Sequence, residues 1–209
     1  MNTILLRPYR KNLTTQGLIY LAGKEQEITI VNISMTGLLA RLNDTTGEKG
    51  IREIFNTLLS SSVLDLYLPE LHTGGEAQVT RVDLQDDHIL IALEFKNLTN
   101  DADHVFYKRK VYRKNLPEIG QILINDTYLE FKAVNVSVEG MMIQLNPGVT
   151  VAPKSITMFK FEKLGLEGEV EVVWVDGLGD GVVLMGLRYV HIEKKSIKGI
   201  PEFARTLAA

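Results

Sequence analysis

Hydrophobic and polar residues alternate with a period of two along most of the second half of the chain. Apolar and charged positions alternate in "LEFKAV" (129–134), and "EVEVVW" (169–174) places Val170, Val172 and Trp174 on one side. This alternation is typical of half-buried antiparallel strands. Short strands at this spacing predict a small barrel. We expect Trp174 in its core, and a place at a binding surface is the alternative. Six strands are predicted, at residues 119–124, 128–134, 140–145, 155–162, 167–175 and 182–190.

The same pattern occurs twice in the chain. Residues 9–43 align without a gap to residues 112–146, with 14 identities in 35 positions. The match continues more weakly between "GEAQVTRVD" (75–83) and "GEVEVVWVD" (168–176). A repeat of this length indicates two copies of one domain.

Two segments depart from the strand pattern. In residues 47–62, apolar residues recur at helical spacing, which predicts an amphipathic helix inserted in the first copy. The C-terminal segment 193–209 has a helix-compatible composition, and Pro201 is well placed to start a short helix. The predicted fold class is therefore all-β, with two small six-stranded antiparallel barrels in tandem. The predicted domains are residues 1–97 and 109–209, joined by a linker at 98–108.

Composition narrows the classes of function. The chain has 209 residues, a net charge of −3 and no cysteine, and its four histidines lack ligand-like spacing, so we expect no metal and no cofactor. A pI near 5.9 argues against nucleic acid as a partner. No apolar run is long enough for membrane insertion, and the N-terminus does not resemble a signal peptide, which favours a cytoplasmic protein.

One basic stretch stands out against this acidic background. "YKRKVYRKNL" (107–116) contains six Lys and Arg, including Arg109 and Arg113. Arginine presents a planar fork that binds phosphate bidentately and can stack on a purine. About twenty residues later, "NVSVEG" (135–140) lies where a strand is predicted to end. Its Asn and Ser offer hydrogen-bonding groups, and its Gly permits a positive φ or close approach of a ligand.

The order and spacing of these motifs resemble the PilZ family, bacterial receptors for cyclic di-GMP. The resemblance covers residues 107 to about 193 and includes "GLRY" (186–189), similar to the family's G-x-x-F ending. It implies that both arginines hold the phosphates and guanine faces of cyclic di-GMP, and that the N-x-S-x-x-G turn lines the guanine edge. A further basic residue beside the first arginine would favour a stacked ligand dimer. The ligand-binding residues implied in this way are Lys108, Arg109, Arg113, Asn135, Ser137 and Gly140.

The first copy keeps only part of this pattern. Its counterparts are Arg10, Asn32, Ser34 and Gly37, whereas the position of Arg109 falls on Leu6. The first copy is therefore interpreted as a degenerate PilZ-like domain, in which the N-x-S-x-x-G turn is structural. We expect it to contact the second copy, a homodimer mate or an effector target.

Three other functions remain open at this point. Both barrels could serve as a protein–protein interaction scaffold without a ligand. An oligonucleotide-binding barrel fits less well, because only 7% of residues are aromatic. An enzyme is not expected, since no nucleophile–base pair, metal cluster or phosphate-binding glycine-rich helix start is evident. The resemblance implies a receptor that regulates motility, biofilm formation or virulence through a protein partner, with the ligand ordering the arginine segment and reorienting the domains.

Overall fold

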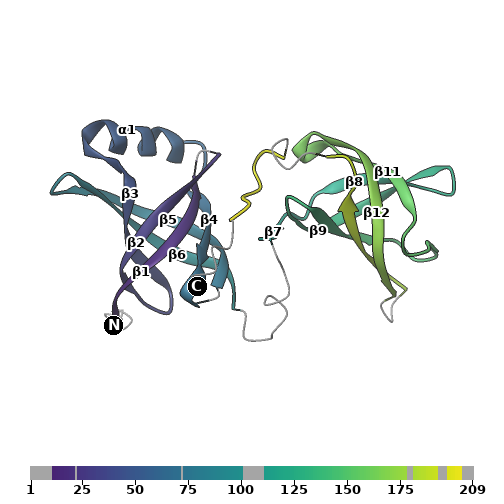
Figure 1. Ribbon diagram of the computed structural model, residues 1–209, viewed down its shortest axis with the longest axis horizontal. Coiled ribbons are helices and arrows are strands. Elements are labelled where there is room, and N and C mark those ends of the chain that lie inside the picture. The colour runs from purple at the N-terminus through teal and green to yellow at the C-terminus, as the bar shows by residue number, and fades with distance from the viewer. Residues whose placement is uncertain are drawn as a thin grey trace, which may run out of the picture. The chain divides into compact units, whose positions relative to one another are not determined.

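The computed structural model of the chain describes residues 11–21, 23–71, 73–100, 111–177, 181–192 and 197–203, and for residues 12–14, 99 and 100 the backbone alone. The chain divides into two compact units, with the boundary before Val111. Each unit is built around its own barrel (Figure 1). Among the described residues, no helix has the length and apolar character of a membrane span.

The first barrel is a closed ring of six antiparallel strands in the order β1-β2-β3-β6-β5-β4. Alternate residues face the interior, so that Ile19, Ile28 and Ile30 are almost fully buried while their neighbours reach solvent. The predicted barrel of the first copy is confirmed. Its strands are β1 (Lys11–Leu21), β2 (Lys24–Ile33), β3 (Gly37–Thr46), β4 (Val63–Leu68), β5 (Thr73–Gln85) and β6 (His88–Asn100).

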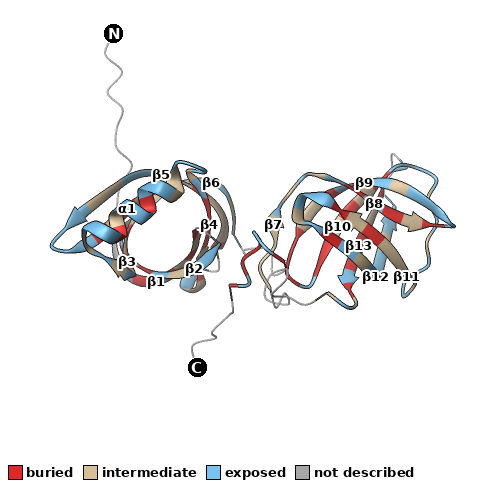
Figure 2. Ribbon diagram, turned by 90° about the horizontal axis from the view of Figure 1, so that it is seen from above, coloured by how far each residue is buried: buried red, intermediate tan, exposed pale blue. Residues whose placement is uncertain are grey.

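The predicted inserted helix is also confirmed. Helix α1 (Gly47–Leu58) follows β3 and lies across one end of the first barrel (Figure 2). It buries Ile54 against the strands and leaves Phe55 and Leu59, the residue after its end, exposed. A short 3-10 turn, η1 (Pro69–Leu71), joins β4 to β5.

The second barrel repeats this architecture. Six antiparallel strands close in the order β10-β13-β12-β11-β8-β9, and a pairing between β9 and β10 completes the ring. The two-residue strand β7 pairs with the last two residues of β9, beyond the part of β9 that pairs with β8. All six predicted strands are present within about two residues of their predicted limits. The elements are β7 (Lys114–Asn115), β8 (Ile119–Ile124), β9 (Thr127–Val136), β10 (Gly140–Leu145), β11 (Ile156–Phe161), the 3-10 turn η4 (Glu162–Leu164), β12 (Leu166–Gly177) and β13 (Val183–Tyr189).

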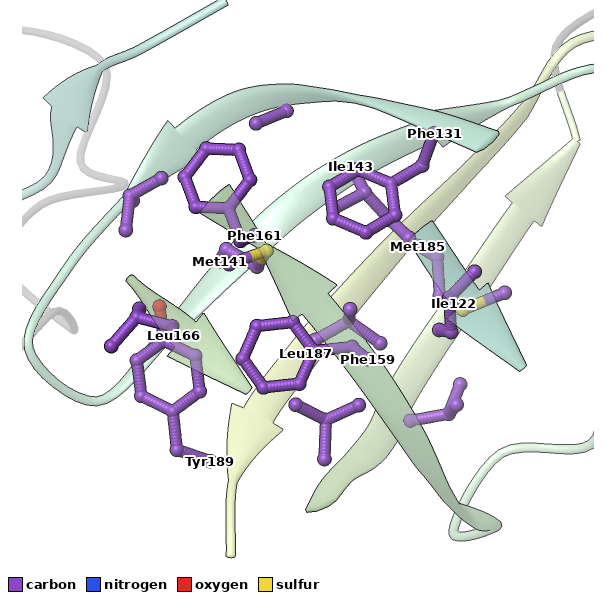
Figure 3. Packing of buried hydrophobic residues seen from close by; sticks show 14 of the residues in the cluster. Ile122, Phe131, Met141, Ile143, Phe159, Phe161, Leu166, Met185, Leu187 and Tyr189 are labelled. Carbon is purple, nitrogen blue, oxygen red and sulfur yellow. The ribbon is translucent and has the colours of Figure 1, made fainter. Parts of the chain in front are cut away.

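Aromatic residues fill the interior of the second barrel (Figure 3). The rings of Phe131 and Phe161 stack with centroids 6.0 Å apart, and those of Phe159 and Tyr189 stack at 5.7 Å. The hydroxyl oxygen of Tyr189 is buried, and among the described residues it has no hydrogen-bond partner. Burial raises the pKa of this phenol well above its usual range.

The predicted core position of Trp174 is wrong. A β-bulge between Val172 and Trp174 inserts one extra residue, Val173, in β12. The extra residue shifts the alternation, because side chains in a strand point to opposite faces in turn. Val172 is fully buried, whereas Trp174 is 37% exposed. The indole therefore lies on the outer face of the barrel.

The structure differs from the prediction at the end of each copy. Residues 197–203 form no helix, and the rest of the predicted C-terminal helix lies outside the described residues. Instead, Ile197 and Ile200 join the core of the second barrel. Residues 98–100, assigned by the sequence to the linker, are the last residues of β6.

Candidate ligand site on the second barrel

The N-x-S-x-x-G motif forms the tight turn between β9 and β10. The Ser137 hydroxyl donates a hydrogen bond to the Gly140 carbonyl at 3.0 Å and accepts bonds from the amides of Glu139 and Gly140. Ser137 is only 2% exposed. The serine thus shapes the turn, and its predicted contact with a guanine edge stays a prediction.

The close approach of strand β13 leaves room only for a glycine at position 140. A Cβ atom at this position would lie 2.0 Å from the Leu187 carbonyl oxygen of β13, closer than any real contact. The glycine thereby lets β10 and β13 approach each other directly after the turn. This packing reason was not visible in the sequence, which suggested a positive φ or close approach of a ligand.

Asn135 and Arg113 lie together beside this turn. Strand β7 pairs with the end of β9, with Asn115 opposite Asn135, so Lys114 and Asn115 at the end of the basic stretch are held against the barrel. Arg113 Nη1 donates a hydrogen bond of 3.4 Å to Asn135 Oδ1. The structure therefore joins one arginine of R-x-x-x-R to the first residue of N-x-S-x-x-G, two residues that lie 22 positions apart.

A row of residues continues from Asn135 across the outer face. Asn135 is opposite Met142 on β10, Met142 is opposite Gly186 on β13, and Gly186 is opposite Trp174 on β12. Adjacent strands lie about 4.8 Å apart. A Cβ atom at Gly186 would lie 2.1 Å from Trp174 Nε1. The indole therefore lies across Gly186, toward Met142 and the turn.

The row beside this one carries a charged pair. Arg188 on β13 is opposite Gly140 and forms a salt bridge with Glu171 on β12. The Arg188 side chain is 63% exposed, so its guanidinium remains accessible on the outer face. Sequence analysis did not select Arg188 or Trp174 as site residues, because their position depends on register across four strands.

The first barrel builds the same turn. The Ser34 hydroxyl donates to the Gly37 carbonyl at 3.1 Å, and a Cβ atom at Gly37 would lie 2.2 Å from the Leu93 carbonyl oxygen. Asn32 differs from its counterpart, since its Oδ1 atom is buried and accepts no hydrogen bond from the residues that the structure describes. Ser and Gly of the motif therefore have a structural role in both copies.

Three predicted site residues, Lys108, Arg109 and Arg10, lie outside the described residues. Within the described ranges, no three His, Asp or Glu side chains gather into a metal-binding cluster. The described part of the site combines a guanidinium, an amide and an indole on one outer face. These groups can bind the phosphate, the edge and the face of a nucleotide, respectively.

The second domain of the chain is similar to a known protein family. Residues 107–204 match the family model described as PilZ domain. Curated protein sequences contain no match to the chain.

Similar solved structures include the inhibitor of motility MotI/DgrA of Bacillus subtilis, with 12% identity over 88% of this chain and 92% of that chain and a TM-score of 0.37. YcgR of Escherichia coli in complex with c-di-GMP has 10% identity over 88% and 80%, with a TM-score of 0.36. PlzA of Borreliella burgdorferi in complex with c-di-GMP has 11% identity over 89% and 86%, with a TM-score of 0.33.

Proposed function

We propose that the protein is a cytoplasmic receptor for cyclic di-GMP, because residues 107–204 match the family model of the PilZ domain. The nucleotide binds on the outer face of the second barrel, beside the β9–β10 turn. The observation that carries the proposal is the hydrogen bond between Arg113 and Asn135. It brings a phosphate-binding group and a base-binding group to one place, as a ligand with two phosphates and two guanines requires.

Each site residue has an assigned role in this proposal. Arg109 and Arg113 hold the phosphates and stack on the guanine faces, and Lys108 favours a second, stacked nucleotide. Asn135 binds a guanine edge through its amide. Ser137 and Gly140 line that edge mainly by shaping the turn, because the Ser137 hydroxyl already bonds within it.

Binding orders the arginine segment. The segment 97–113 joins the two domains in the chain, and its arginines gain phosphate partners only when the nucleotide is present. Charge pairing then draws the segment onto the second barrel and changes the orientation of the domains, which is the signal. The protein acts as a switch, with no chemistry performed on the ligand.

The first domain transmits this signal to a protein partner. It is a degenerate PilZ-like barrel, in which Arg10, Asn32, Ser34 and Gly37 do not form a nucleotide site. Its inserted helix α1 presents Phe55, 51% exposed, to an effector target that controls motility, biofilm formation or virulence. A homodimer would use the same exposed surface.

A ligand-free interaction scaffold is the second candidate. The observation in its favour is that Ser and Gly of the turn motif have the same structural role in both barrels. Those two residues would therefore persist in a barrel that binds nothing. The arginine at position 113, placed against Asn135, favours the receptor.

Isothermal titration calorimetry with cyclic di-GMP separates the two candidates. The receptor requires saturable binding by the whole chain, loss of binding in Arg109→Ala and Arg113→Ala, and near-normal binding in Arg10→Ala. Absence of heat and of any shift in melting temperature with the wild-type chain would leave the scaffold as the function.

A further inference from the structure

The C-terminal tail, residues 197–203, contacts Tyr112, which is the residue before Arg113. The ring of Phe203 meets the ring of Tyr112 edge to face, with centroids 5.0 Å apart and planes at 72°. Tyr112 directly precedes Arg113 in the chain, and both precede the short strand β7. The two ends of the second domain therefore meet at the start of the candidate site.

The tail is anchored although it has no regular secondary structure. Ile197 and Ile200 belong to the core of the second barrel, and Phe203 is only 1% exposed. Figure 2 shows much of this segment in the colour of buried residues. Apolar side chains thus hold the tail on the domain, and Phe203 is its last described residue.

The backbone conformation of Phe203 also indicates that packing holds the tail in place. Its φ of 37° is a conformation that bulky residues seldom adopt. Such a conformation persists only where the surrounding packing specifies it. The position of the Phe203 ring is therefore imposed by its contacts, and the edge-to-face pair with Tyr112 is one of them.

We infer that Phe203 is a positioning residue for nucleotide binding, acting through Tyr112 on Arg113. This inference rests on the proposed function. The tail fixes the Tyr112 ring, which restricts the backbone that carries Arg113 and keeps its guanidinium near Asn135. An aromatic edge-to-face pair contributes roughly two- to tenfold to an equilibrium constant. Because linkage is reciprocal, the bound nucleotide must in turn stabilise the docked tail.

The test compares two buried phenylalanines of the same barrel in the full chain. Phe203→Leu removes the ring contact with Tyr112 and keeps a large apolar side chain. Phe161→Leu is the matched control, because Phe161 is fully buried and stacks on Phe131, which pairs with the last residue of β10, away from the turn. Both changes should lower the melting temperature. Only Phe203→Leu should weaken cyclic di-GMP binding, by about fivefold.

A double-mutant cycle identifies the route. Tyr112→Leu, at a half-buried position, should cause a similar loss of affinity, and Tyr112→Phe should retain binding because it keeps the ring. The double variant Tyr112→Leu/Phe203→Leu should lose little more than either single variant, since the two residues act as one unit. Additive losses would contradict the proposed route.

Two further readouts separate the outcomes. In the free protein, NMR relaxation of the Arg113 Nε–H group should show greater mobility in Phe203→Leu and no change in Phe161→Leu. In hydrogen exchange, cyclic di-GMP should slow exchange at residues 197–203 of the wild type. Normal affinity and normal Arg113 mobility in Phe203→Leu would overturn this inference alone, whereas absence of binding by the wild type would overturn the proposed function and this inference together.

Discussion

The two barrels share a turn and differ on the face beside it. In the second barrel, the row across the outer face reads Asn135, Met142, Gly186 and Trp174. In the first barrel, the matching row reads Asn32, Leu39, Ala92 and Arg81. An indole could not lie flat across Ala92, because the methyl group would occupy the space that Gly186 leaves open. The indole on the outer face of the second barrel therefore has no counterpart among the described residues of the first barrel.

The charged residue opposite the motif glycine also differs between the two barrels. Arg188 in the second barrel is opposite the motif glycine, and Glu94 has this place in the first barrel. Glu94 pairs with Lys96 at 3.0 Å, while Arg188 pairs with Glu171. A nucleotide with two phosphates would meet a guanidinium in one barrel and a carboxylate in the other. The shared residues thus specify the turn, and in the proposed function the differing residues determine which barrel binds the nucleotide.

The largest expected effect comes from the arginine beside Asn135. Arg113→Ala should weaken cyclic di-GMP binding about 100-fold, because it removes charge-assisted hydrogen bonds that each contribute about 1.5–3 kcal/mol. Arg10→Ala, the matching change in the first barrel, should leave the affinity within twofold. Titration of both variants by calorimetry measures the difference, and equal losses would contradict the distinction between the barrels.

The next largest loss of affinity is expected when the Trp174 indole is removed. Trp174→Ala should weaken binding about tenfold, since stacking of a base on an aromatic ring contributes about 1–3 kcal/mol. Arg81→Ala at the matching position of the first barrel should have no effect on affinity. Fluorescence of Trp174, the single tryptophan, should also change on titration with the nucleotide. Unchanged fluorescence and affinity would exclude the indole from the site.

Gly186→Ala is the sharper control for the indole. It keeps the ring in the protein but displaces it, because the new methyl group would lie 2.1 Å from Trp174 Nε1. We expect a loss of affinity close to that of Trp174→Ala. Ala92→Gly in the first barrel should not change binding. If Gly186→Ala bound normally, the position of the ring across β13 would be irrelevant to the nucleotide.

A smaller effect is expected from charge on the outer face. Arg188→Glu, which copies Glu94 of the first barrel, should weaken binding about fivefold, and the loss should shrink at high salt because the side chain is exposed. The reverse change, Glu94→Arg, should leave affinity and stoichiometry unchanged. Titrations at two salt concentrations test both variants. A second bound nucleotide in Glu94→Arg would mean that charge alone had excluded the ligand from the first barrel.

The smallest effect concerns stability. Phe95 has the position of Tyr189 in the first barrel, since their amides donate to Thr36 and Glu139 in matching bonds of 2.9 and 3.0 Å. Tyr189→Phe removes a buried hydroxyl that has no partner in the described part of the chain, and should stabilise the second barrel by about 1 kcal/mol. Thermal melting measures this change, and a lower melting temperature would show that the hydroxyl is bonded in solution.

The same residue predicts a dependence on alkaline pH. Burial raises the pKa of folded Tyr189 above its ordinary value of 10.0. Above that value the unfolded chain loses the phenol proton while the folded chain keeps it, so the stability of the wild type should fall as the pH rises past about 10. Tyr189→Phe should lose less stability over this range. Parallel pH curves for the two proteins would contradict the raised pKa.

Much of the fold could be predicted from the sequence, because the repeat and the alternation of apolar residues act locally. The six strands of the second barrel and helix α1 were predicted in this way. The outward position of Trp174 was not predicted. The bulge at Val173 shifts the alternation of inward and outward side chains, and a run of apolar residues gives no sign of the bulge. The tail was not predicted either, because Phe203 meets Tyr112 across 91 positions (203 − 112).

The candidate site was partly predictable for the same reason. The two motifs and their resemblance to the PilZ family selected Arg113 and Asn135, and the structure brings these residues together. The packing role of Gly140 and the outer position of Arg188 depend on which strands are neighbours in the barrel. No pattern along one strand carries that information. A comparison of the two copies identifies the neighbouring residues only once the pairing of the strands in each barrel is known.

The central claim is that one barrel binds the nucleotide and the other does not. Calorimetric titration of the whole chain with cyclic di-GMP, alongside Arg113→Ala and Arg10→Ala, tests it most directly. The account predicts saturable binding at the second barrel, lost in Arg113→Ala and retained in Arg10→Ala. Binding that survives Arg113→Ala and disappears in Arg10→Ala would contradict it, as would a wild-type chain that binds no nucleotide.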